Sequence, residues 1–91
     1  MKVVAITVSG KVQGVFFRKY TQMKANELNV SGSVRNMPNG DVYLEVQGTK
    51  DQIDEMIQWC HKGSPLSIVK KVEVKKVTLT EIIPQRFVII Y

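Results

Sequence analysis

Apolar residues in this chain of 91 residues follow two different spacings that take turns along the sequence. In some stretches they fall at every second position, which is the period of a half-buried strand. In others they recur three or four positions apart, which is the period of a helix with one buried face. The spacing predicts strands at 2–9, 30–37, 41–47, 68–79 and 87–91, and helices at 16–28 and between Thr49 and Gly63.

Several local signals support these elements. Thr49 and Gln52 have the spacing of a capping box, and Gly63 is a typical residue just past a helix end. The pair Asn39-Gly40, between two strand patterns, predicts a hairpin. The first helix is expected to bury a stripe formed by Phe17, Tyr20, Thr21, Ala25 and Leu28.

The order of the elements, βαββαβ with a short C-terminal strand, predicts an α+β fold. We expect a ferredoxin-like sandwich in which two helices lie on one face of an antiparallel sheet. In that arrangement the third strand lies between the first and the second. The first and second strands are then parallel, and their C-terminal ends lie at the same edge of the sheet, about 9–10 Å from each other. Asn36, at the end of the second strand, should therefore lie across from the loop that follows the first. The whole chain, 1–91, is expected to form one domain.

The stretch from Ser9 to Arg18 joins the first strand to the first helix through a loop expected at residues 10–15. Its glycines allow backbone N–H groups to converge, and a helix N-terminus favours negative charge. Arg18 adds a planar cation that can bind phosphate through two hydrogen bonds. The spacing matches neither a P-loop nor a dinucleotide fingerprint. The stretch predicts a phosphate cradle formed by Arg18 and the loop residues Gly10, Lys11, Val12, Gln13, Gly14 and Val15.

The net charge of +5 suits anionic partners. Much of the excess lies in the strand expected at 68–79, as Lys70-Lys71 and Lys75-Lys76, and lysine commonly protects an edge strand from aggregation. The alternation there changes phase between Val74 and Val77, which predicts a bulge or bend at Lys75-Lys76.

Cys60 is the only cysteine, so neither an intrachain disulfide nor a cluster of cysteine metal ligands can form. No apolar run approaches the ~20 residues that a membrane span needs. The first residues are too short and too alternating for a signal peptide. We therefore expect a cytoplasmic protein.

The residues Gly10-Lys11-Val12-Gln13-Gly14-Val15-Phe16-Phe17-Arg18 resemble the first signature of the acylphosphatase family. Residues 32–42, followed by Gly48, resemble the second, and residues 87–91 are similar to the family ending. The resemblance thus covers essentially the whole chain. It implies hydrolysis of the carboxyl–phosphate bond of acyl phosphates without a metal or cofactor. It also implies that Arg18 binds the phosphate and that Asn36 positions the attacking water.

The chain departs from that family pattern at three places. Ser33 stands where an aromatic residue is usual, and Ile90 where arginine is frequent. Gly63-Ser64-Pro65 replaces the usual Gly-Pro-Pro. Because none of these falls on Arg18 or Asn36, we expect them to affect local packing, stability and rate rather than function.

The implied chemistry suits the residues. An acyl phosphate carries a good carboxylate leaving group, so its hydrolysis mainly requires positioning and charge stabilisation. Arg18 supplies a fixed cation, and Asn36 supplies an amide that can hold water without titrating. The expected partners are an acyl phosphate and inorganic phosphate, for a monomer with no nucleic-acid or membrane partner.

Two alternatives remain at this point. The chain could be a non-catalytic anion- or RNA-binding module of the same fold. RNA-recognition domains stack bases on aromatic residues of the third strand, where this chain offers Tyr43 beside Glu45. Asn36 could instead prepare the hairpin turn, because asparagine favours such positions.

Overall fold

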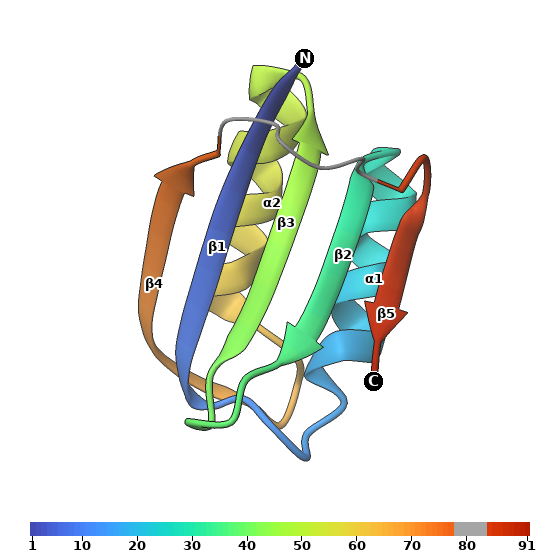
Figure 1. Cartoon of the computed structure of the whole chain (residues 1–91). Coiled ribbons are helices and arrows are strands. Elements are labelled where there is room, and N and C mark those ends of the chain that lie inside the picture. Colours follow the sequence, from blue (N-terminus) through green and yellow to red (C-terminus); the bar gives the residue numbers. More distant parts are fainter. Residues whose placement is uncertain (78–83) are drawn as a thin grey trace.

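The computed structural model describes residues 1–77 and 84–91. Over this part of the chain the elements follow the expected order (Figure 1). They are β1 (Lys2–Lys11), α1 (Phe17–Leu28), β2 (Ser31–Asn36), β3 (Val42–Gly48), α2 (Lys50–Lys62), β4 (Ile68–Lys76) and β5 (Phe87–Ile90). The ferredoxin-like α+β fold is confirmed.

The strands form one sheet in the order β4-β1-β3-β2-β5. β3 pairs antiparallel with both β1 and β2, so these two strands run in the same direction and end at the same edge, as expected. β5, however, pairs parallel with β2, with Gly32 opposite Phe87 and Val34 opposite Ile89. The strands β4, β1, β3 and β2 thus form the expected antiparallel sheet, and the short C-terminal strand, whose pairing was not predicted, makes the whole sheet mixed.

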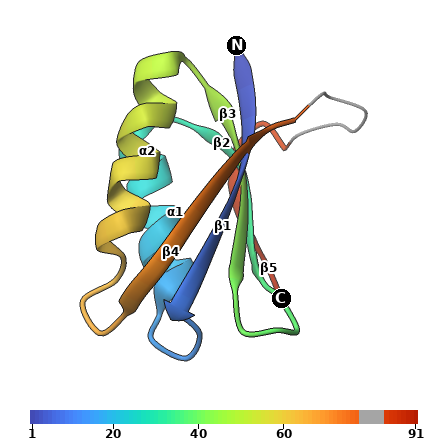
Figure 2. The same cartoon turned by 90° about the vertical axis from the view of Figure 1, so that its left-hand side faces the viewer.

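Both helices cover the same face of the sheet, and the core lies between the two layers (Figure 2). β3 shows why: Val42, Leu44 and Val46 are fully buried, while the residues between them are half-exposed. The rings of Phe17 in α1 and Trp59 in α2 pack with centroids 5.3 Å apart and planes tilted by 55°. The buried side chains at every second position of β3 thus face the apolar sides of the helices across the core.

The predicted end of α1 and both predicted ends of α2 are confirmed, whereas α1 begins one residue later than expected, at Phe17. Asn29 ends α1 in the left-handed conformation, with a φ of 60°. At the start of α2, Gln52 N donates to Thr49 Oγ1 at 3.2 Å and Thr49 N donates to Gln52 Oε1 at 2.9 Å, which completes the capping box. Gly63 follows the last residue of α2. The stripe of α1 is narrower than expected, because Tyr20 is 37% exposed at its edge.

The irregularity predicted at Lys75-Lys76 lies instead at the other end of β4. Lys75 and Lys76 pair regularly with β1, whereas the register shifts between Ser9 and Gly10, opposite Lys70. The extra residue, Lys70, therefore lies in β4. β4 is an edge strand and its lysines are exposed, as expected. Residues 78 and 79, which were expected to extend this strand, lie outside the described residues.

Candidate active site

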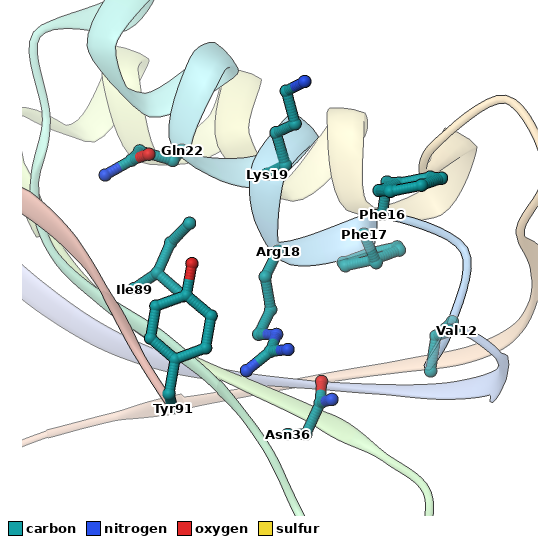
Figure 3. A pocket seen from close by; sticks show the side chains of 10 residues that line it. Val12, Phe16, Phe17, Arg18, Lys19, Gln22, Asn36, Ile89 and Tyr91 are labelled. Atoms are coloured by element: carbon teal, nitrogen blue, oxygen red, sulfur yellow. The ribbon is translucent and has the colours of Figure 1, made fainter.

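A cleft opens where the start of α1 faces the ends of β2 and β5 (Figure 3). It brings together residues from three separate parts of the chain. The residues that line it are Val12, Gly14, Phe16, Phe17, Arg18, Lys19 and Gln22 from the loop and α1, Asn36 from β2, and Ile89 and Tyr91 from the C-terminal segment. Arg18 and Asn36, the two expected catalytic residues, therefore share one cleft.

The loop between β1 and α1 has a backbone suited to an anion. Gly14 and Phe16 have positive φ angles of 74° and 60°, and Val15 between them has a negative one. Such alternation turns successive backbone N–H groups toward a common concavity, which binds anions. The first N–H groups of α1 lie directly after this turn, where the helix dipole also favours negative charge.

Three hydrogen bonds hold this loop in place. Gln13 Nε2 donates to the carbonyl oxygens of Met37 at 2.7 Å and of Asp41 at 2.8 Å, in the turn between β2 and β3. On the other side, Ser64 Oγ donates to the carbonyl oxygen of Val15 at 2.9 Å. The departure from Gly-Pro-Pro thus adds a buried contact to the loop. Because its backbone is already fixed, a bound anion would not have to order it.

The predicted cradle residues divide into two groups. Gly10 and Lys11 belong to β1 rather than to the loop, and they do not line the cleft. Gly10 has a φ of 128°, and a side chain there would collide with the backbone carbonyl of Ile68. The close approach of β4 therefore accounts for this glycine. Of the loop residues, Val12 and Gly14 line the cleft, whereas Gln13 and Val15 do not. A side chain at Gly14 would meet open space, so its positive φ alone favours glycine.

Arg18 extends from the first turn of α1 toward the sheet, and Figure 3 shows its guanidinium group pointing toward Asn36. Its Nη1 donates to the carbonyl oxygen of Ile90 at 3.4 Å. The ring of Tyr91 lies 4.8 Å from its guanidinium carbon. The β5 end of the sheet therefore holds the arginine at the cleft without neutralising its charge.

The contribution of β5 to the cleft was missing from the sequence-based prediction. Ile89 and Tyr91 were assigned to a short strand without a role at the site. Gln22 Nε2 donates to the carbonyl oxygen of Phe87 at 3.2 Å, which ties β5 to α1 beside Arg18. Phe16 was also missed as a cleft residue, because the sequence places it at the start of the helix expected at 16–28 and outside the predicted core stripe. No local signal in the sequence places residue 91 next to residue 18.

The side chains that commonly bind metals do not cluster in the described part of the chain. Among residues 1–77 and 84–91, no three or more His, Cys, Asp or Glu side chains are placed to hold a metal ion. Cys60 is fully buried in α2, and burial raises the pKa of its thiol to about 12. No helix in this part of the structure is both long and apolar enough to cross a membrane.

Comparison with known proteins places this geometry in a family. The acylphosphatase family model matches residues 4–89. The acylphosphatase of Rubrobacter xylanophilus is 48% identical over 75 residues, which cover 82% of this chain and 68% of that protein. The acylphosphatase of Shewanella amazonensis is 44% identical over 82 residues, 90% of each chain. The crystal structure of acylphosphatase from Bacillus subtilis superimposes with a TM-score of 0.93 at 33% identity, covering 100% of both chains. This chain belongs to the acylphosphatase family.

Proposed function

We propose that this protein is an acylphosphatase that hydrolyses acyl phosphates to a carboxylate and inorganic phosphate. The observation that carries the proposal is the meeting of Arg18, from α1, and Asn36, from β2, in one cleft beside a loop whose amides converge. In this proposal the backbone N–H groups of the loop and the Arg18 guanidinium bind the phosphate. Membership of the family supports this reading over the alternative of a non-catalytic anion- or RNA-binding module.

The proposed reaction is an in-line displacement at phosphorus. The Asn36 amide holds a water molecule, whose oxygen attacks the phosphorus while the bond to the carboxylate oxygen breaks on the opposite side. The carboxylate leaves with the electron pair of that bond, and the water proton passes to a phosphate oxygen. Arg18 and the loop amides stabilise the charge on the phosphoryl oxygens in the transition state. Because the carboxylate is a good leaving group, the proposed mechanism uses no metal and no general acid.

The finer expectations about the molecule also remain proposals. We infer a monomer of one domain that works in the cytoplasm on small anions, without a nucleic-acid partner. The exposed lysines of the edge strand β4 support the monomer, since they oppose pairing with a second sheet. The hydrophobic core, which β1, β3 and both helices share, supports the single domain. Light scattering with size-exclusion chromatography tests the monomer.

The experiment that tests the activity is phosphate release from acetyl phosphate in the presence of EDTA. We expect the wild-type protein to turn over under these conditions, and Arg18→Ala to lose about 10³-fold or more in kcat/KM. Arg35→Ala is the matched control, because Arg35 lies outside the cleft. Its guanidinium carbon lies 5.3 Å from the centroid of the Tyr43 ring. The proposal is wrong if the wild-type protein releases no phosphate, or if the two arginine variants behave alike.

A further inference from the structure

Phe16 combines three features that are unfavourable in a folded protein. Its φ of 60° and ψ of 24° lie in the left-handed region, where a bulky side chain is strained. It occupies the N-cap position of α1 but makes no side-chain cap hydrogen bond. Its side chain is also 67% exposed, although phenylalanine is among the most apolar residues. Strain of this kind concentrates at functional sites.

The backbone of Phe16 has an explanation that its side chain does not share. The positive φ belongs to the alternation that turns the loop amides inward, and glycine or asparagine would adopt it with less strain. The aromatic ring adds nothing to that geometry. It instead forms part of the cleft wall. A role for the ring must therefore come from something that enters the cleft.

The proposed reaction fixes where the acyl group of the substrate lies. In an in-line displacement, the attacking and leaving oxygens stand on opposite sides of the phosphorus. Figure 3 shows Asn36 on the sheet side of the cleft and Phe16 on the helix side, with the Arg18 side chain reaching from one layer toward the other. A water molecule held by Asn36 then directs the leaving carboxylate away from the sheet, toward the helix side of the cleft, whose lining includes Phe16.

We propose that Phe16 forms a wall of an acyl subsite that favours aromatic and extended apolar acyl groups over acetyl. The inference rests on the proposed function, since it places the acyl group by the geometry of that reaction. An exposed ring offers an aromatic acyl group a stacking or edge-to-face contact. The methyl group of acetyl is too small to make that contact. Phe16 is thus a specificity-determining residue, and it takes no part in the bond changes.

The test compares kcat/KM for benzoyl phosphate with kcat/KM for acetyl phosphate. Phe16→Asn removes the ring with a residue that tolerates the left-handed conformation and can cap α1. We expect this variant to lower the benzoyl-to-acetyl ratio roughly five- to tenfold. Phe16→Tyr should keep the wild-type ratio. Inhibition by inorganic phosphate should not change in either variant, because the loop amides and Arg18 remain.

Two further variants make the result specific. Tyr20→Ala removes an aromatic ring that is exposed on the same helix and lies outside the cleft, and it should leave the ratio unchanged. Ile89→Ala trims the β5 side of the cleft. If Ile89→Ala lowers the ratio and Phe16→Asn does not, the acyl group lies along β5 and the inference is wrong. An equal loss on both substrates in Phe16→Asn also overturns it. If the wild-type protein hydrolyses neither substrate, the proposed function itself fails.

Discussion

The Tyr91 ring lies 4.8 Å from the guanidinium carbon of Arg18, at the far end of the chain from it. The neighbouring Ile90 carbonyl oxygen accepts a hydrogen bond from Arg18 Nη1 at 3.4 Å. Because this bond uses the main chain, isoleucine at position 90 supplies it as well as arginine would. β5 and the residue after it thus restrain a side chain that would otherwise sample many rotamers in the cleft.

Replacing Tyr91 tests whether this restraint matters for catalysis. We expect Tyr91→Leu to lower kcat/KM about two- to fivefold, since a cation–π contact at an exposed site contributes about 0.5–1 kcal/mol. Tyr91→Phe should retain most of the activity. The control is Tyr43→Leu, which removes a similar contact with Arg35 outside the cleft. Wild-type kinetics in Tyr91→Leu would show that Arg18 needs no help from β5.

Arg18→Lys is expected to be a severe change although it keeps the charge. Lysine loses the planar fork that can make two parallel hydrogen bonds to phosphate. Arginines that stabilise phosphoryl-transfer transition states contribute about 10³–10⁵ in rate, and we expect a loss near the lower end of that range. Inhibition by inorganic phosphate should weaken as well. Turnover close to that of the wild type would mean that the arginine is structural.

Asn36→Ala should separate chemistry from phosphate binding. The loop amides and Arg18 remain, so inorganic phosphate should inhibit as before, while kcat collapses because an interaction made chiefly in the transition state is gone. The free energy of unfolding should fall by at most ~1–2 kcal/mol. Both quantities can be measured on one folded sample. A parallel loss of turnover and phosphate inhibition would instead assign Asn36 to phosphate binding.

Asn39→Ala is the control for the alternative role of Asn36 in the hairpin turn. Asn39 Oδ1 accepts a hydrogen bond from Asp41 N at 3.0 Å, so Asn39 supports the turn. Its replacement should lower stability slightly and leave kcat near the wild-type value. If Asn39→Ala lost turnover as Asn36→Ala does, the shape of the turn would explain both effects.

Gly10 and Gly14 should respond very differently to alanine. At Gly10 a side chain would meet the backbone of Ile68, so we expect Gly10→Ala to lower the free energy of unfolding by about 2–4 kcal/mol. At Gly14 it would meet open space, and the cost should be the ~1–2 kcal/mol of the left-handed conformation alone. Denaturant unfolding of the two variants measures the difference. Equal losses would contradict the close approach of β4 to Gly10.

Cys60 should make the stability depend on pH in the alkaline range. Burial raises the pKa of its thiol from 9.0 to about 12. Between these values the unfolded chain releases a proton that the native state retains. The free energy of unfolding should therefore fall by up to about 1.4 kcal/mol per pH unit as the pH rises above 9. Cys60→Ala should lack this part of the slope. Parallel profiles for the two proteins would show that the thiol does not contribute.

The sequence by itself determined the order and type of the elements and both ends of α2. The two-residue period of β3 fixed which of its side chains are buried, and the Thr49–Gln52 pair fixed the start of α2. These signals are local, because a period or a cap depends on residues a few positions apart. Arg18 and Asn36 were identified from their motifs, and the expected strand order was enough to place them in one cleft.

Only the tertiary structure decided what joins distant parts of the chain. The parallel pairing of β5 with β2 brings Tyr91 to Arg18, and the contact with β4 explains Gly10 and moves the bulge to Lys70. Such pairings depend on register across the sheet, which alternation of apolar residues within one strand does not specify completely. Phe16 shows the same limit: the sequence places it inside the helix expected at 16–28, but in the structure it precedes α1 with a positive φ and an exposed ring at the cleft.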